Sequence, residues 1–266
     1  MKTPRTTGNR IIEYLNEGKR FDGRALGEFR EISIETDISN KAEGSARVKI
    51  GKTEVVVGVK IDVAAPYPDS PNKGNLMVTS ELLPLSSSRF ESGPPKFPAI
   101  ELGRLVDRGI REGKFVDFEK LCIKEGEKVW SVFIDIYSIN DDGNLLDAAG
   151  IGALIALKTA KLPKYDEETG KVLYGELTDE NVPVSKDVPI ITTIHKIGDS
   201  VIADPTLEEE DVSEVRVTIG GSCEGKVFSM QKGGSGMLSV EDMHEVLDFA
   251  EKARKDVFSK IEKYFK

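Results

Sequence analysis

The sequence predicts an α/β protein of the α+β type, in which two pseudo-repeated lobes of mixed sheet pack with helices. Alternating apolar and polar runs, typical of strands, are followed by helical patterns twice along the 266 residues. Short turns that suit hairpins outnumber long crossovers, which disfavours a doubly wound parallel sheet. With 39% hydrophobic residues, the chain has enough apolar material for one large domain or two compact lobes.

The first half is expected to open with a helix and to continue mainly as strands. Ile11, Ile12 and Leu15 recur at helical spacing and predict a helix at about 8–17, which Gly18 ends. The further elements predicted in this half are strands at 32–34, 46–50, 53–66, 75–83 and 129–139, a hairpin turn at 51–52, an exposed connector at 86–98, and helices at about 99–112 and 145–161, the latter stopped by Pro163.

The second half repeats the plan more compactly. Strands are expected at 188–197, 200–204, 214–221 and 226–231, before a long helix that runs from Ser239 to the end. Ser239 and Asp242 resemble a capping box at the start of this helix. Its buried face is predicted to comprise Val240, Met243, Leu247, Ala250, Val257 and Ile261.

This pattern divides the chain into four parts. Residues 1–30 form an N-terminal helix and arm, and residues 31–163 the first lobe. The polar stretch 164–187 is a connecting excursion, and residues 188–266 form the second lobe with the long C-terminal helix.

Composition restricts the classes of function. No apolar run is long enough to span a bilayer, and the N-terminus lacks the apolar core of a secretory signal, so no membrane partner is expected. Cys122 and Cys223 are isolated, which indicates a reduced cytoplasmic protein without a structural zinc site. The net charge of −9 argues mildly against nucleic-acid binding, although a local basic stripe would suffice.

One such stripe is present. Arg104, Arg108 and Arg111 follow one another at i, i+4 and i+7, so they share one helix face. From spacing alone, a solvent-exposed face with local pairs such as Asp107–Arg111 is the favoured interpretation, and a nucleic-acid contact is the alternative.

Six segments in order resemble the RNase PH family of phosphorolytic exoribonucleases. They are RFDGR (20–24), AEGSARVKIGKTEVVVGVK (42–60), ESGPP (91–95), IELGRLVDRGIR (100–111), DDGNLLDAAGIGALIAL (141–157) and ADPTLEEE (203–210). The last two are most similar to the non-catalytic RNase PH-like subunit of the archaeal exosome. This resemblance implies an RNase PH-like fold and a hexameric ring in which three such chains alternate with three catalytic partners. It also implies single-stranded RNA and RNA-binding cap subunits as further partners.

The resemblance also implies that the phosphate site is degenerate. Active members of the family carry Gly-Gly-Thr-Arg at the turn before the helix, where a hydroxyl, a cation and a helix N-terminus hold the attacking anion. Here the same positions are Gly143, Asn144, Leu145 and Leu146. Two leucines provide neither a donor nor a cation.

The acidic segment departs from the family in the same direction. Where active relatives place three aspartates for proton transfer and magnesium, this chain has Asp204, Glu210 and Arg216. A cation at the third position would repel Mg²⁺. The run 208–211 could be taken for a metal cluster, but a solvated acidic turn is the better interpretation. We therefore expect no catalytic residue, no bound metal and no cofactor.

By the same resemblance the arginine stripe becomes an RNA contact, with Arg104 and Arg108 favoured over Arg111. The sequence supports a non-enzymatic ring subunit that binds RNA and helps to shape its partner's active site. The alternatives are a self-sufficient 3′→5′ phosphorolytic exoribonuclease assembled as a homohexamer, and an acidic protein-interaction module without an RNA role.

Other features have structural interpretations. The charges of the 20–24 motif are expected to fix the N-terminal segment against the core. His195 lies in an alternating strand and is expected to be an ordinary sheet residue, and Met230 and Met237 are expected to fill the core.

Overall fold

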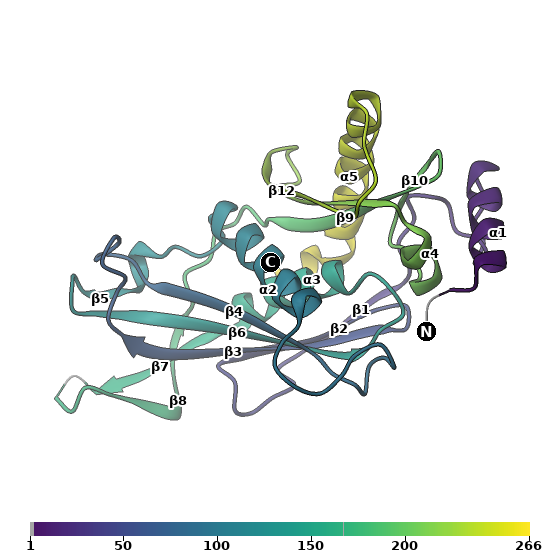
Figure 1. Cartoon of the computed structure of the whole chain (residues 1–266). Coiled ribbons are helices and arrows are strands. Elements are labelled where there is room, and N and C mark those ends of the chain that lie inside the picture. The colour runs from purple at the N-terminus through teal and green to yellow at the C-terminus, as the bar shows by residue number, and fades with distance from the viewer. Residues whose placement is uncertain (1–2, 167) are drawn as a thin grey trace.

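The computed structural model of the chain describes residues 3–166 and 168–266 and is drawn in Figure 1. Its elements in chain order are α1 (Arg5–Asn16), β1 (Ile32–Thr36), β2 (Gly44–Ile50), β3 (Thr53–Ala64), β4 (Asn75–Leu82), α2 (Phe97–Glu112), η1 (Glu119–Leu121), β5 (Cys122–Lys124), β6 (Lys128–Asn140), α3 (Leu145–Thr159), β7 (Lys161–Asp166), β8 (Lys171–Asn181), β9 (Ile190–Ile197), β10 (Ser200–Ala203), α4 (Leu207–Val212), β11 (Val215–Gly221), β12 (Val227–Gly233), α5 (Val240–Ile261) and η2 (Glu262–Tyr264).

The larger sheet has the order β1-β2-β3-β6-β4, and the short strand β5 also pairs with β6. Its pairs are antiparallel except for β4 with β6, which makes the sheet mixed. Along β3 buried residues such as Val55 and Val57 alternate with half-buried ones, as expected for a sheet covered on one face.

The smaller sheet has the order β10-β9-β11-β12 and is antiparallel throughout. Helices α2 and α3 lie between the two sheets, α3 against β2, β3 and β9, and α2 against β4, β11 and β12 (Figure 1). The close approach requires Gly109, because a Cβ there would come within 2.6 Å of the Ile191 side chain. One hydrophobic core runs through both lobes, and the predicted fold class is confirmed.

Several predicted boundaries shift. Helix α1 starts at Arg5 rather than near residue 8, and α2 starts at Phe97, with Pro98 in its first turn where no amide hydrogen bond is lost. Helix α3 ends at Thr159, and the expected stop, Pro163, lies instead in β7. The polar stretch 164–187 contains most of the β7–β8 hairpin.

Three residues predicted to be buried are exposed. Val240, in the first turn of α5, is 68% exposed, although the capping box formed by Ser239 and Asp242 is present. Met230 on β12 is 38% exposed and Met237 in the loop before α5 is 91% exposed, so neither fills the core. β12 pairs only with β11 and α5 begins after an open loop, so these side chains have little to pack against.

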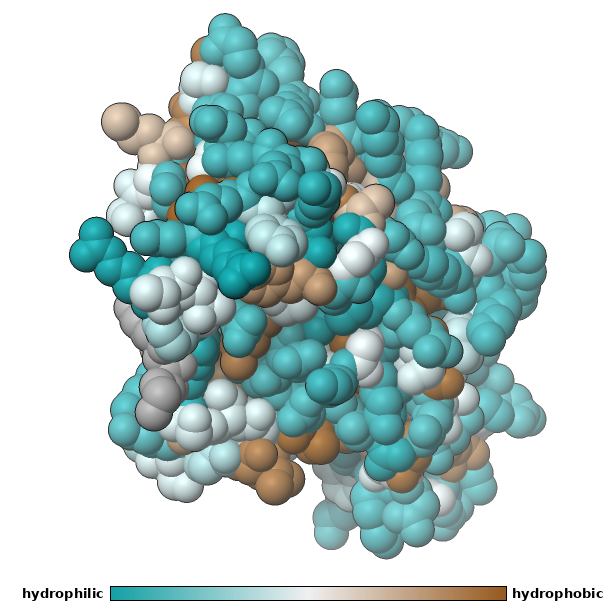
Figure 2. All heavy atoms as spheres, turned by 90° about the vertical axis from the view of Figure 1, so that its right-hand side faces the viewer, coloured by the Kyte–Doolittle hydropathy of each residue, from teal (hydrophilic) through white to brown (hydrophobic). Residues whose placement is uncertain are grey.

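The N-terminal helix has its own small core. Ile11 and Leu15 of α1 pack against Ile197 and Ile202 at the end of the β9–β10 hairpin. Figure 2 shows this side of the molecule, where hydrophilic side chains predominate and hydrophobic ones form only small separate patches. Among the described residues, no helix is both long and apolar enough to cross a membrane.

Candidate functional site: a leucine-lined cavity and an exposed arginine face

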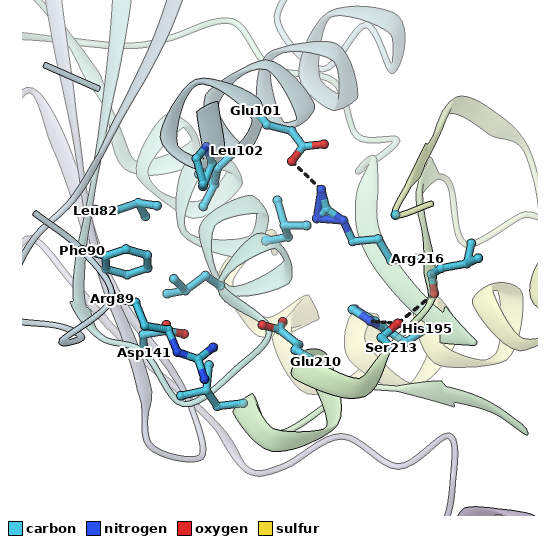
Figure 3. A pocket seen from close by; sticks show the side chains of 16 residues that line it. Leu82, Arg89, Phe90, Glu101, Leu102, Asp141, His195, Glu210, Ser213 and Arg216 are labelled. Atoms are coloured by element: carbon cyan, nitrogen blue, oxygen red, sulfur yellow. Dashed lines mark hydrogen bonds and ion pairs between the residues drawn. The ribbon is translucent and has the colours of Figure 1, made fainter. Parts of the chain in front are cut away.

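A cavity of about 350 Å³ lies where α2, the start of α3, β9, α4 and β11 meet (Figure 3). Leu145 and Leu146, the first two residues of α3, form part of its wall and pack against the core. Glu210 and Arg216, from α4 and β11, line the same space. The structure therefore brings Leu145, Leu146, Glu210 and Arg216 of the two predicted degenerate sites to one leucine-lined cavity, whereas Asn144 and Asp204 do not line it.

The amide at the start of α3 is occupied by a carboxylate of the chain itself. Asn144, in the left-handed conformation with φ of 62°, donates its backbone N–H to Oε1 of Glu210 at 2.7 Å. A helix N-terminus attracts anions because its amides lack partners within the helix and the dipole is positive there. Glu210 thus occupies the amide at the start of α3.

Burial raises the pKa of Glu210 to about 7, since the carboxyl has lost most of its water. The hydrogen bond from Asn144 opposes that rise, and the neighbouring carboxyl of Asp141 adds to it. Burial also raises the pKa of Asp141, and Figure 3 shows both side chains at the same cavity. Both carboxyl groups at this cavity therefore favour the protonated form more than a solvated carboxyl does.

Asp204 lies below the cavity, fully buried, and does not line it. Its carboxylate accepts hydrogen bonds from Arg24 at 2.8 Å, from the Arg30 guanidinium at 2.7 and 2.9 Å, and from the Asn144 side chain at 2.8 Å. Burial alone would raise its pKa, but the hydrogen bonds and charge of Arg30 lower it below its usual value. Asp204 is therefore a structural anchor between the N-terminal arm and the turn before α3.

The two arginines that line the cavity are neutralised. Arg216 pairs with Glu101 of α2 at 2.5 Å, and Arg89 pairs with Asp211 at 2.6 Å. Figure 3 shows the Arg216 guanidinium drawn toward Glu101 across the cavity. Because each cation already has a carboxylate partner, neither offers its full charge to a bound anion.

His195 also lines the cavity, from β9. Burial lowers its pKa to about 3, with the nearby charge of Arg216 acting in the same direction, so the imidazole is neutral at physiological pH. One ring nitrogen, Nδ1, lies 3.0 Å from the Ser213 hydroxyl. The residue lies in a strand, as predicted, but β9 is buried along nearly all of its length instead of alternating.

The acidic run 208–211 is neither a metal cluster nor a fully solvated turn. Glu208 is exposed, but Glu209 is buried and pairs with Arg20 at 2.5 Å. The expectation of a solvated turn was therefore wrong for Glu209. Within the parts of the chain that the structure covers, no three His, Cys, Asp or Glu side chains come together as metal ligands.

The helix α2 carries a contrasting surface, the α2 arginine face, formed by Arg104, Arg108 and Arg111. Arg111 forms the expected pair with Asp107 at 2.7 Å and also bonds to the Leu76 carbonyl at 3.2 Å. Arg104 and Arg108 are exposed, and neither side chain has an ion pair or hydrogen bond to any described residue. Two of the three predicted cations thus remain available to an external anion.

Comparisons with known proteins decide the family. The model of the 3′ exoribonuclease family, domain 1, matches residues 28–163, and that of domain 2 matches residues 187–253. The chain belongs to the 3′ exoribonuclease, or RNase PH, family. Proteins named exosome complex component Rrp42 from Thermococcus onnurineus and Methanocella arvoryzae are 48% and 46% identical to it, over 90% and 95% of this chain and 88% and 94% of theirs.

A solved structure of the same family gives an equally full match. The structure described as the Archaeoglobus fulgidus exosome with RNA bound to the active site contains a chain 41% identical to this one. The match has a TM-score of 0.88 and covers 96% of this chain and 98% of that one. The resemblance predicted from six short segments is confirmed along nearly the whole length.

The 20–24 motif has the structural role predicted for it. Arg20 is buried and holds Glu209 through two nitrogens, at 2.5 and 2.9 Å, while also bonding to the carbonyls of Ala203 and Asp204. Arg24 bridges Asp22 and Asp204. The arm before the first sheet is thus fastened to the second lobe.

Four residues of the site region were missed by sequence reasoning. Arg30, Arg89 and Glu101 have partners more than a hundred positions away, and no local pattern signals them. Asp147, a buried acid in the first turn of α3, could have been noticed as the only charged residue in the run LLDAAGIGALIAL. Burial raises its pKa to about 8, and hydrogen bonding from the neighbouring Thr193 and Asn144 offsets only part of that rise.

Proposed function

We propose that this chain is the non-catalytic RNase PH-like subunit of an exosome, a complex that degrades RNA 3′→5′ by phosphorolysis. In this proposal it alternates with a catalytic RNase PH-like subunit in a hexameric ring, a trimer of heterodimers, on which RNA-binding cap subunits dock. Membership of the 3′ exoribonuclease family and similarity to proteins named exosome complex component Rrp42 support the assignment. The free cysteines Cys122 and Cys223 fit the reducing cytoplasm that we propose as its location.

The observation that carries the non-catalytic part is the occupation of the α3 N-terminus by Glu210. Phosphorolysis brings inorganic phosphate and a phosphodiester together, so its catalysis depends on positioning and on neutralising negative charge. Here the helix amide holds an internal carboxylate, Leu145 and Leu146 supply apolar walls, and Arg216 is paired with Glu101. The leucine-lined cavity is built to exclude an anion.

The α2 arginine face supplies the RNA-binding part. An arginine binds phosphate oxygens bidentately without distinguishing bases, which suits a complex that accepts any RNA sequence. Arg104 and Arg108 have no competing carboxylate in the described part of the chain, whereas Arg111 is held by Asp107. We therefore assign the RNA contact to Arg104 and Arg108 first and to Arg111 second.

Reconstitution with the catalytic RNase PH-like subunit of the same cell tests both parts. We expect the chain alone to release no nucleoside diphosphate from RNA in the presence of phosphate, and the mixture to form a ring of both chains that does. Mass measurement, RNA binding and phosphorolysis are compared for each chain and for the mixture. Phosphate-dependent cleavage by the chain alone would establish the homohexameric enzyme instead.

Charge reversal tests the RNA contact. Arg104→Glu with Arg108→Glu is expected to weaken binding of a labelled single-stranded RNA to the reconstituted ring by at least tenfold and to slow its decay, because two attractive contacts become repulsive. The control is Lys41→Glu with Lys252→Glu, an equal charge change at two exposed lysines of other surfaces. Equal rates of RNA decay in the two variants would show that Arg104 and Arg108 do not bind RNA.

A further inference from the structure

A second opening adjoins the C-terminal end of α2 and is distinct from the leucine-lined cavity. It has a volume of about 690 Å³ and is walled by the β3–β4 loop, by the segment after α2 and by residues 183–185. Backbone hydrogen bonds tie these walls together, from Gly74 to Phe118 at 2.8 Å and from Asp117 to Pro183 at 2.8 Å. The opening is therefore a fixed feature of the fold. We call it the lysine cleft.

Positive charge predominates in the lysine cleft. Lys73, Arg111, Lys114 and Lys120 line it, against the acids Asp117 and Glu119. Lys120 pairs with Asp117 at 3.1 Å, and Lys73 reaches Glu119 only at 4.0 Å, between side chains that are largely exposed. Such exposed pairs are weak and open readily for a stronger anion.

Lys114 is held in a conformation that favours glycine. Its φ is +48°, and the hydrogen bonds from its own amide to the Arg111 carbonyl and from Phe115 to the Ile110 carbonyl close α2 as a Schellman motif. The position in this motif is usually glycine, because a Cβ is unfavourable there. The Lys114 ammonium has no ion pair or hydrogen bond within the described ranges. A strained backbone thus places an unneutralised cation at the cleft.

The lysine cleft also offers aromatic surface. Tyr67, in the β3–β4 loop, is 48% exposed. Phe118 also lines the cleft, and the Arg111 guanidinium lies 5.6 Å from the centre of its ring. Cations beside an exposed aromatic ring are the combination by which proteins hold single-stranded nucleic acids, with phosphates on the cations and a base stacked on the ring.

We propose that the lysine cleft binds single-stranded RNA, as a continuation of the stretch held by the α2 arginine face. The inference rests on the proposed RNA-binding function and extends it to a second group of residues. Arg111 belongs to both surfaces, and from Arg104 to Arg111 the helix rises by about 10 Å. Phosphates pass from Arg104 and Arg108 to Lys114 and Lys73, and one base stacks on Tyr67.

The test is made with rings reconstituted from this chain and its catalytic partner, using a fluorescent oligoadenylate as probe. Lys73→Gln with Lys114→Gln is expected to weaken binding about tenfold and to make the dependence of log Kd on log salt shallower by about 1.4, since each lost phosphate contact on a single strand accounts for about 0.7. The matched control, Lys41→Gln with Lys252→Gln, keeps the affinity and the slope of the unchanged ring.

A second variant separates stacking from charge. Tyr67→Ala is expected to weaken binding about tenfold while leaving the salt slope unchanged, because it removes a base contact and no phosphate contact. Thermal melting of each variant checks that folding is intact, as expected for side chains this exposed.

The outcomes are distinguishable. If the lysine variant behaves like its control while the Arg104 and Arg108 variant loses affinity, the lysine cleft is not an RNA site and the proposed function stands. If neither loses affinity, the RNA role of the chain fails altogether. If an acidic peptide competes for the cleft as well as RNA does, and Tyr67→Ala has no effect, the cleft is a protein-docking site and the inference is overturned.

Discussion

The leucine-lined cavity and the α2 arginine face both include residues of α2, and both contain arginines. In the cavity each arginine is matched with a carboxylate, as Arg216 is with Glu101. On the helix face Arg104 and Arg108 have no such match among the described residues. The difference separates the arginines that the chain neutralises itself from those that it leaves unpaired in its described part. In the proposed function, the unpaired arginines are the ones that bind RNA.

The contrast predicts first that the region around the cavity depends on its internal pairs for stability. Asp204→Asn leaves the guanidinium groups of Arg24 and Arg30 half-buried without a full counter-charge, while asparagine tolerates the positive φ of this position. We expect the free energy of unfolding to fall by about 3–5 kcal/mol, measured by urea denaturation.

The control for this variant is Asp142→Asn, which weakens the other ion pair of Arg30. The Asp142 side chain is only partly buried and lies 3.5 Å from the guanidinium, so its loss is expected to cost less than about 1 kcal/mol. Equal losses in the two variants would mean that Asp204 is not an anchor between the N-terminal arm and the turn before α3.

A second prediction concerns Asp147, the buried acid in the first turn of α3. Its pKa in the folded chain is about 8, against about 3.8 when unfolded, so the folded state holds a proton that the unfolded state releases. The stability it provides is complete below about pH 4 and is lost as the pH rises toward 8. Asp147→Asn removes this loss. We expect the free energy of unfolding of the variant to be about 2–4 kcal/mol larger than that of the parent chain at pH 8 and equal to it near pH 4.

Urea denaturation of both chains at several values between pH 4 and pH 8 measures the difference. Glu210, with a pKa of about 7, also titrates in this range, and His195, with a pKa of about 3, stays neutral. Both residues are present in both chains, so their contributions to stability cancel from the difference. A constant difference between the two chains over the whole range would show that Asp147 is ionised in the folded protein.

Local signals account for what the sequence predicted correctly. Alternation of apolar residues placed the strands of both sheets, and the Ser239–Asp242 spacing placed the start of α5, because both depend on neighbours within a few residues. The resemblance to the RNase PH family predicted that Leu146 belongs to a degenerate phosphate site, and Glu210 and Arg216 to a degenerate acidic one. The three residues line one cavity.

Tertiary contacts account for what it could not predict. The partners of Asp204 and Asp211 lie 174 and 122 residues away in Arg30 and Arg89, so no spacing rule reaches them. Helical periodicity placed Val240 on the inner face of α5, but the first turn extends beyond the second sheet and leaves it exposed. Periodicity gives the direction of a side chain, and only the neighbouring elements decide whether anything covers it.

The smallest change in the free energy of unfolding is expected for the unpaired arginines of α2. Arg104→Ala with Arg108→Ala removes two cations that contact no carboxylate in the described chain, from exposed positions of a helix where alanine is favourable. The free energy of unfolding is therefore expected to change by less than about 0.5 kcal/mol. Arg216→Ala is the matched control, because it leaves the half-buried Glu101 without its ion-pair partner. It is expected to lower the free energy of unfolding by about 1–2 kcal/mol. If removing Arg104 and Arg108 lowered the free energy of unfolding as much as removing Arg216, the two arginines would be structural. The inference that they are free to bind RNA would then fail.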